Sequence, residues 1–245
     1  MPMPRIYLPT IHIERNRISI TDEKARYLIS VLRCQKGDDL IIFDGEGNCY
    51  RTTILKADRK EVITEVIEKF PCNTESHINI TLVQGLLKGE KMDMVIQKTT
   101  ELGVKEIIPV VTERSQLRET RKVARWRKIA EEASRQSGRS LIPVIHEPIK
   151  FNNFLSDHDQ QNRFPGFIFY EEDGVKLSKA VSSLVSRPSS LSVLIGPEGG
   201  FTKEEITLAT EMGLHVISLG KRILRAETAA ISAITLIQYL LGDLG

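Results

Sequence analysis

The sequence predicts a mixed α/β protein with a small β-rich part over residues 1–72 and a larger part over residues 73–245. Short strand-like runs separated by turns fill the first seventy residues. From residue 78 onward, apolar strand-like runs alternate with helical patterns. Alternation of this kind indicates a largely parallel sheet that is covered by helices on both faces. A chain of 245 residues is long enough for one large domain or two modest ones.

The strand-like runs of the first part are short and apolar, and they lie at residues 5–9, 17–20, 39–43, 48–54 and 62–68. Asp44 to Gly47 has the composition of a turn between two of them. One helix is expected after Thr21, because Ala25, Leu28, Ile29 and Leu32 share a helical face. Such a series of strands predicts a small barrel or a sandwich. Residues 70–76 are polar enough to form a linker.

The second part has six strand-like runs, at residues 78–83, 107–111, 141–145, 167–170, 193–195 and 216–219. Helical stripes fill several of the gaps between them. One stripe runs from Met92 to Leu102 and is followed by Gly103, and another begins at Val123 and is followed by Gly138. Thr202 and Glu205 form the pattern of a capping box before a further helix.

The net charge of the chain is only +2, and its composition of 41% hydrophobic and 27% charged residues is typical of globular proteins. Charge is nevertheless concentrated between Thr112 and Arg139, where nine basic residues face four glutamates. A local excess of this kind predicts contacts with phosphates. The alternative is an ordinary solvated helix face.

Metal, disulfide and membrane features are not expected. Cys34, Cys49 and Cys72 are widely spaced, and the five histidines are scattered without ligand spacing. The N-terminus lacks the apolar core of a signal peptide, and residues 231–241 are too few to cross a bilayer. We therefore expect a cytoplasmic protein without a metal site, a disulfide framework or a membrane association.

A glycine-rich segment, Gly196-Pro197-Glu198-Gly199-Gly200-Phe201, lies between an apolar strand and a capped helix. Glycines at such a junction allow a ligand to approach the backbone, and the helix N-terminus offers free N–H donors. The segment lacks the Gly-Lys-Ser/Thr ending of a P-loop and the glycine spacing of the dinucleotide fingerprint. Considered alone, it is equally compatible with a structural turn.

A second segment, residues 218–230, also follows a strand and opens a helix. Its apolar side chains, Leu219, Ile223 and Leu224, lie among strong charges. This mixture suits a ligand that has both an adenine ring and a charged amino-acid tail. Glu227 or Thr228 is placed to cap the following helix. The alternative for this segment is a basic surface turn.

Together the two segments resemble the SPOUT methyltransferases, and within them the RsmE family. The pattern is Gly-Pro-Glu-Gly-Gly-Phe followed by Leu-Gly-x-x-Ile-Leu-Arg-x-Glu-Thr-Ala. The similarity covers nearly the whole chain. It continues at residues 5–7, at Leu32-Arg33 with Gly37-Asp38, at 97–104, at Glu113-Arg114-Ser115 and at 126–139. Thr99 stands where alanine is more common, at a position without a catalytic role.

The resemblance implies an architecture and a reaction that the residues alone do not establish. The first 72 residues would form a PUA-like RNA-binding β-barrel, and residues 73–245 a SPOUT domain with a deep trefoil knot. The expected activity is methylation of N3 of a uridine in 16S ribosomal RNA, free or in the small ribosomal subunit, by a homodimer that uses S-adenosyl-L-methionine.

Residue roles follow from the same resemblance and from the chemistry. The expected cofactor contacts are Glu171, Ile195, Gly196, Gly199, Gly200, Leu219, Gly220, Arg222, Ile223 and Leu224. The expected RNA contacts are Arg5, Arg33, Arg114, Arg118 and Arg125. Neutral uracil N3 carries a proton, so a nearby cation would favour its anion, and Arg225 is the candidate for that role.

Glu198 and Glu227 are candidates for a general base. Glu227 has the alternative role of a helix cap, and Glu198 that of an acceptor that organises its loop. Positioning alone can also supply much of the rate, so a dedicated base is not required.

Three other functions remain open at the level of sequence. A non-catalytic RNA-binding protein would have the basic stretch but would not need two ligand-type loops. A SPOUT methyltransferase could act on a different RNA nucleotide. A nucleotide-utilising enzyme would need a phosphate-binding loop after residues 78–83, and Gly85 to Gly89 has no suitable fingerprint.

Overall fold

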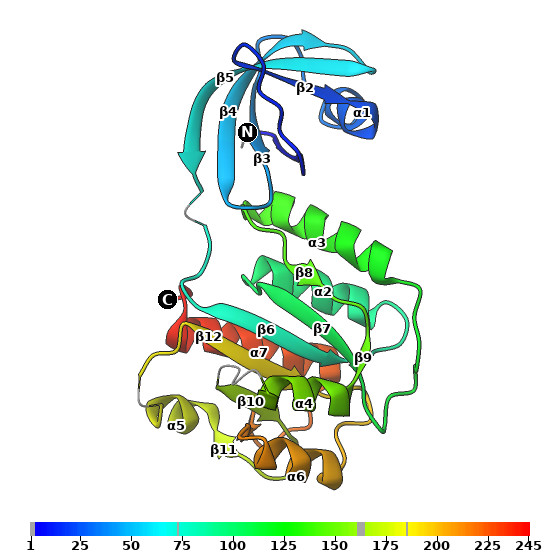
Figure 1. Cartoon of the computed structure of the whole chain (residues 1–245), viewed down its shortest axis with the longest axis vertical. Helices are drawn as coiled ribbons and strands as arrows, with labels where there is room; N and C mark the ends of the chain where they lie inside the picture. Colours follow the sequence, from blue (N-terminus) through cyan, green and yellow to red (C-terminus); the bar gives the residue numbers. More distant parts are fainter. Residues whose placement is uncertain (1–2, 73, 161–164, 185) are drawn as a thin grey trace. The chain divides into compact units, whose positions relative to one another are not determined.

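The computed structural model describes residues 3–72, 74–160, 165–184 and 186–245. Met1 and Pro2 at the start of the chain, and Asn73 within the predicted linker, lie outside the described residues. Figure 1 shows the chain with colours that follow the residue number. Backbone contacts divide the chain into two units. The first contains residues 1–75 and 134–142, and the second contains residues 76–133 and 143–245. The inclusion of residues 134–142 in the first unit differs from the simple boundary at residue 72 expected from the sequence.

The first unit contains one five-stranded sheet with the order β1-β3-β4-β5-β2. Its elements are β1 (Arg5–Tyr7), β2 (Arg17–Thr21), α1 (Asp22–Ser30), β3 (Asp39–Phe43), β4 (Asn48–Ala57) and β5 (Glu61–Pro71). The pair β1–β3 is parallel, and the other pairs are antiparallel. Because the five strands form a single sheet, the sandwich alternative is wrong. Alternate residues such as Ile18 and Ile42 point into a core that includes Leu28 of α1.

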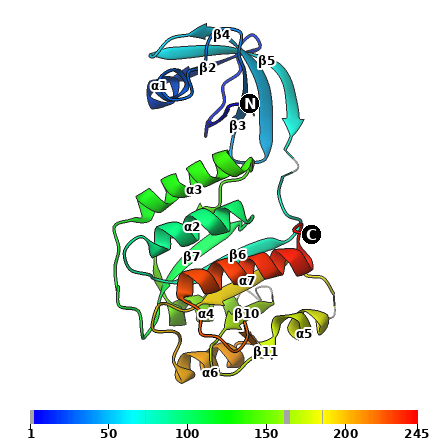
Figure 2. The same ribbon diagram turned by 180° about the vertical axis from the view of Figure 1, so that it is seen from behind.

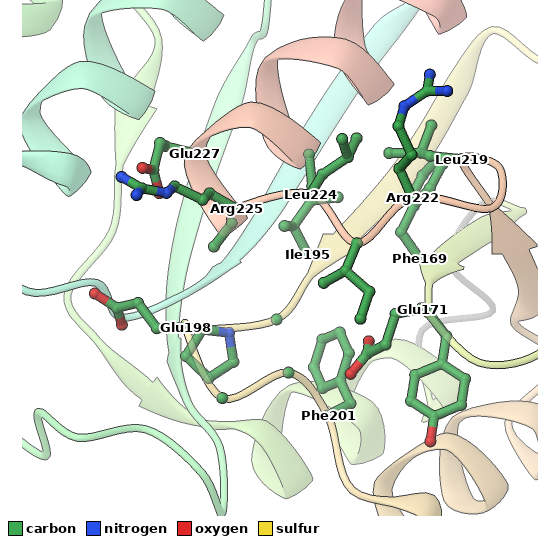
Figure 3. A pocket seen from close by; sticks show the side chains of 18 of the residues that line it. Phe169, Glu171, Ile195, Glu198, Phe201, Leu219, Arg222, Leu224, Arg225 and Glu227 are labelled. Carbon is green, nitrogen blue, oxygen red and sulfur yellow. The ribbon is translucent and has the colours of Figure 1, made fainter.

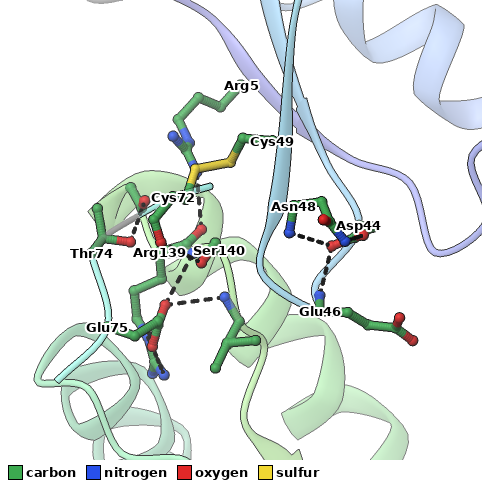
Figure 4. The surroundings of a disulfide bond; sticks show 12 residues. Arg5, Asp44, Glu46, Asn48, Cys49, Cys72, Thr74, Glu75, Arg139 and Ser140 are labelled. Carbon is green, nitrogen blue, oxygen red and sulfur yellow. Dashed lines mark hydrogen bonds and ion pairs between the residues drawn. A yellow bond between two sulfur atoms is a disulfide. The ribbon is translucent and has the colours of Figure 1, made fainter. Parts of the chain in front are cut away.

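A disulfide joins Cys49 and Cys72, so the expectation of no disulfide is wrong (Figure 4). The antiparallel ladder of β4 and β5 places Cys49 opposite Phe70, and Cys72 follows β5 directly. The two Cα atoms are 5.9 Å apart, within the range that a disulfide requires. The spacing of 23 residues is no recognised motif, and only the strand register brings the two cysteines together.

Arg139 is buried in the first unit, where it forms an ion pair with Glu75 at 2.7 Å (Figure 4). The same carboxylate accepts the backbone N–H groups of Ser140 and Leu141 at 3.0 and 3.1 Å. The end of the basic stretch is therefore structural. The prediction that the basic stretch contacts phosphates is therefore wrong for Arg139, because its guanidinium is buried and paired with Glu75.

The second unit is built on an eight-stranded sheet with the order β11-β13-β10-β12-β6-β7-β8, and β9 also pairs with β7. All of these pairs are parallel, as predicted. The strands are β6 (Asn79–Gly85), β7 (Glu106–Val111), β8 (Val144–Ile145), β9 (Ile149–Lys150), β10 (Gly166–Phe169), β11 (Val175–Lys176), β12 (Ser190–Ile195) and β13 (His215–Ser218).

Helices cover both faces of this sheet. They are α2 (Lys91–Glu101), α3 (Val123–Ser137), α4 (Phe151–Gln160), α5 (Leu177–Ser182), α6 (Lys203–Glu211) and α7 (Ala226–Leu241). Helices α2 and α7 pack together on the face seen in Figure 2, and α4 lies on the opposite face. On the α4 face, Phe151 and Phe201 are in ring contact within the core. None of the helices in the described ranges is long and apolar enough to cross a membrane.

The predicted helix ends are confirmed at three places. Gly103 and Gly138 follow α2 and α3 in the left-handed conformation, with φ of 85° and 84°. The capping box of Thr202 and Glu205 is present at the start of α6. Left-handed φ favours glycine because other residues then bring Cβ close to the backbone.

Candidate active site

Three neighbouring parallel strands, β13, β10 and β12, end beside one cavity of about 300 Å³ (Figure 3). Their order in the sheet places the loops after all three strands at the same edge. Open α/β sheets bind their ligands at the carboxyl ends of strands. The cavity is near the lower end of the size range of small-molecule sites. All of its lining residues belong to the second unit.

The loop after β12 forms one wall of the cavity with its backbone. Gly200 has φ of +69°, and a Cβ atom built there would lie 2.5 Å from Oε1 of Glu171. A Cβ on Gly85, at the end of β6, would lie 2.4 Å from the backbone nitrogen of Pro197. At Gly85 the backbone of Pro197 leaves no space for a side chain, and at Gly200 the positive φ favours glycine while a Cβ would displace the end of the Glu171 side chain.

The glycine loop is also held from outside the cavity by the segment that follows β7. Nη1 of Arg114 donates to the carbonyl oxygens of Gly199 and Phe201 at 3.1 and 3.2 Å. Oε1 of Glu205 accepts the backbone N–H of Glu113 at 2.8 Å, while Oε2 serves the capping box. Glu113 and Arg114, which belong to the family-like motif, therefore anchor the loop.

The loop after β13 forms the opposite wall. Gly220 has φ of +112°, and Leu219 and Leu224 contribute apolar surface to the cavity. Ile223 also lines the cavity, yet 84% of its surface is exposed. Ile223 therefore presents an apolar surface to solvent at the mouth of the cavity.

Arg225 and Glu227 both line the cavity and appear on the same side of it in Figure 3. Arg225 is exposed and occupies the N-cap position of α7, and Glu227 is in the first turn. No side chain caps this helix, so the expectation that Glu227 or Thr228 is a cap is wrong. Oε2 of Glu227, like Oε2 of Glu198, is buried without a hydrogen-bond partner among the described residues. A buried carboxylate oxygen without a partner is costly, which favours a role toward a ligand.

Glu198 is held by two donors from the turn that follows β6. Its Oε1 accepts the backbone N–H of Lys88 and the Nζ of Lys91, both at 3.0 Å. Burial alone would raise the pKa of Glu198, but these hydrogen bonds outweigh it and hold the pKa below the ordinary value. A carboxylate with a lowered pKa is a poor general base. The structure therefore favours the alternative in which Glu198 organises its loop.

The structure brings all the sequence-predicted cofactor and catalytic residues to this one cavity. They are Glu171, Ile195, Gly196, Glu198, Gly199, Gly200, Leu219, Gly220, Arg222, Ile223, Leu224, Arg225 and Glu227. Sequence reasoning missed several lining residues, chiefly Lys91, Phe169, Pro197 and Phe201. Phe169 ends a predicted strand and Phe201 belongs to the quoted motif, so both could have been included. Lys91 carried no such signal, since its partner Glu198 is 107 positions away.

The predicted RNA contacts differ in how far their charges are available. Arg33 and Arg114 are exposed, although Arg114 uses one nitrogen on the glycine loop. Arg118 is exposed and donates to the carbonyl oxygens of Thr112 and Glu113. Arg125 forms an ion pair with Asp93 at 2.9 Å. Arg5 is partly buried, and its guanidinium stacks on Phe43 and donates to the carbonyl of Arg139.

No group of three or more possible metal-ligating side chains is present among the described residues.

Comparison with known proteins agrees with this geometry. The model of the RNA methyltransferase domain matches residues 74–238, and that of the RNA methyltransferase PUA domain matches residues 20–67. The chain is 34% identical to a ribosomal RNA small subunit methyltransferase E of Buchnera aphidicola, over 98% of this chain and 95% of that protein. It is 33% identical to the protein of the same name from Bacillus subtilis, over 92% and 91%.

A solved structure is similar over its whole length. It is the ribosomal RNA small subunit methyltransferase E of Neisseria gonorrhoeae bound to S-adenosyl methionine, with a TM-score of 0.88 and 33% identity. The alignment covers 99% of this chain and 100% of that one. The fold and the cavity at the strand ends thus define an RNA methyltransferase. More specifically, the chain belongs to the ribosomal RNA small subunit methyltransferase E family.

Proposed function

We propose that this protein transfers a methyl group from S-adenosyl-L-methionine to N3 of a uridine in 16S ribosomal RNA. The observation that carries the proposal is the single cavity that unites both sequence motifs at the strand ends of the parallel sheet. The relatives that share these motifs are named for methylation of small-subunit ribosomal RNA, and the gonococcal structure contains S-adenosyl methionine. The proposal is tested by the position of the methyl group in RNA treated with the purified protein.

The residues of the cavity fit this cofactor. Phe169, Leu219 and Leu224 supply apolar surface for an adenine ring, and the bare backbone at Gly200 leaves room for close approach. The carboxylate of Glu171 lies next to Gly200 and would accept hydrogen bonds from an ammonium group. Bound S-adenosylmethionine supplies an electrophilic methyl group, and the electrons of the broken C–S bond remain on sulfur.

The chain's own groups would prepare the base for this attack. N3 of uracil loses its proton and uses the resulting lone pair to bond to the methyl carbon. Oε2 of Glu227 is the proposed proton acceptor, because it is buried and unpartnered while Glu198 is held by Lys88 and Lys91, and the proton then passes to solvent. The guanidinium of Arg225 would stabilise the anion, because arginine keeps its charge at any working pH.

We also propose that the first unit and the basic segment of residues 114–128 bind RNA, in free 16S RNA or in the small subunit. The match of residues 20–67 to an RNA methyltransferase PUA domain supports RNA binding by the expected domain 1–72. Catalysis is assigned to the expected domain 73–245, in which residues 74–238 match the RNA methyltransferase domain. The proposed location is the cytoplasm, where ribosomal subunits are assembled.

The active form is proposed to be a homodimer. Leu236 and Tyr239 of α7 and Met94 of the adjoining α2 are exposed by 41%, 65% and 49%. A second copy on this face would cover these apolar side chains. Leu236→Glu should therefore give a monomer in sedimentation, whereas the wild type sediments as a dimer. A wild-type monomer at micromolar concentration would contradict this part of the proposal.

A further inference from the structure

Lys91 is a cation of the cavity that holds Glu198 and has no assigned role toward the target base. It is the first residue of α2, it lines the cavity, and 41% of its side chain is exposed. Its Nζ lies 3.0 Å from Oε1 of Glu198. Figure 3 shows Glu198 on the same side of the cavity as Arg225 and Glu227. Lys91 therefore lines the cavity next to Glu198, on the side where Figure 3 also shows Arg225, and its ammonium group has further N–H donors besides the one used on Glu198.

The position of Lys91 is fixed by the loops around it. Glu198 also accepts the backbone N–H of Lys88, so one carboxylate oxygen ties the turn after β6 to the glycine loop. Gly85 packs against Pro197 too closely for any side chain, which holds the same two segments together. These contacts fix the position of Lys91, and its side chain still lines the cavity. A cation that is positioned before the reaction stabilises developing charge most effectively.

We propose that Lys91 and Arg225 together recognise the two carbonyl oxygens that flank N3 of the target base, and so select uracil. The inference rests on the proposed function. Loss of the N3 proton spreads negative charge over N3 and both neighbouring oxygens, so one cation beside each oxygen stabilises the whole anion. Cytosine carries an amino donor in place of one oxygen, and a lysine or arginine donor facing it would leave both groups unpaired.

The test compares Lys91→Met with Lys98→Met, a matched change on the same helix at a residue that pairs with Glu101 outside the cavity. Single-turnover methylation is measured on 16S RNA transcribed with uridine or with 5-fluorouridine, whose fluorine makes N3 more acidic. Lys91→Met should slow methylation of uridine RNA on the order of 100-fold. Its deficit should shrink several-fold on 5-fluorouridine RNA, because that base needs less help to lose its proton.

Three further readouts separate a role toward the base from a structural one. The affinity for S-adenosylmethionine, measured by isothermal titration, should be unchanged in Lys91→Met. Lys91→Arg should recover most of the rate, and Lys98→Met should match the wild type. Equal deficits of Lys91→Met on the two RNAs, or a weakened cofactor affinity, would show that Lys91 only supports the loop and would overturn the inference. A wild-type protein that forms no 3-methyluridine would instead overturn the proposed function on which it rests.

Discussion

At the scale of single residues, Arg225 has the clearest expected role in the reaction. Its side chain lines the cavity on the same side as Glu227 in Figure 3. Arg225→Ala should lower the methylation rate roughly a hundredfold, or about 3 kcal/mol, as expected for loss of one anion-stabilising group. The affinity for S-adenosylmethionine should be nearly unchanged. Single-turnover rates and calorimetric titration measure the two quantities.

Raising the pH should partly restore the Arg225→Ala variant, because solvent hydroxide then helps to remove the N3 proton. The alternative role for this arginine is an ion pair across a dimer interface. In that case the variant would become monomeric or unstable, and high pH would give no recovery. Sedimentation of the same purified variant distinguishes these outcomes.

Gly200 tests the assignment of the cofactor loop. Its φ of +69° is strained for any other residue, and a methyl group there would displace the carboxylate of Glu171. Gly200→Ala should therefore weaken S-adenosylmethionine binding at least tenfold by displacing Glu171 or the loop, an estimate that corresponds to about 1.4 kcal/mol. Gly213→Ala is the matched control, since Gly213 also has positive φ but lies after α6, outside the cavity. Equal cofactor affinities of the two variants would remove Gly200 from the site.

Sequence reasoning identified the residues of the two loops but not the contacts between loops. The glycine pattern and the apolar trio of the last loop were recognisable because each is a local motif. The hydrogen bond between Lys91 and Glu198 joins residues 107 positions apart, and that between Arg114 and Gly199 joins residues 85 apart. Such pairs are created by the order of strands in the sheet, which a single sequence does not display.

At the scale of elements, strands were predicted best where apolar runs are long and bounded by turns. The strand β3 has the expected bounds, and β6 and β12 differ only at their ends. The run at residues 141–145 was placed too early, because only Val144–Ile145 pairs with β7. Helix α4 was missed although Phe151, Phe154 and Leu155 are spaced as a buried helical face.

The RNA-binding role of the basic residues belongs to this scale, because it depends on a segment rather than on one side chain. Each phosphate contact contributes about 0.7 to the slope of log affinity against log salt for single-stranded RNA. The double variant Arg33→Gln with Arg118→Gln should therefore bind RNA more weakly and reduce that slope by roughly 1.4. Filter binding at several salt concentrations measures both. Arg187→Gln, an exposed arginine outside the predicted set, is the control, and an unchanged slope in the double variant would remove both residues from the RNA surface.

At the scale of the whole molecule, the mixed α/β class and the parallel sheet were predictable from the alternation of strands and helices. The grouping of residues 134–142 with the first unit was not, because it depends on contacts such as that of Glu75 with Arg139. The trefoil knot and the homodimer stay predictions from the family. A single sequence cannot establish either one, since both depend on long-range geometry rather than on local pattern.

The most direct test of the account is the chemical identity of the product. Purified protein is incubated with unmodified 16S ribosomal RNA, or with small subunits that contain it, and with S-adenosylmethionine carrying a labelled methyl group. The RNA is then digested to nucleosides and analysed by mass spectrometry. We predict one labelled 3-methyluridine per RNA molecule, and none with Arg225→Ala over the same short reaction time. Label in any other nucleoside, or no label in RNA when the protein binds the cofactor, would contradict the account.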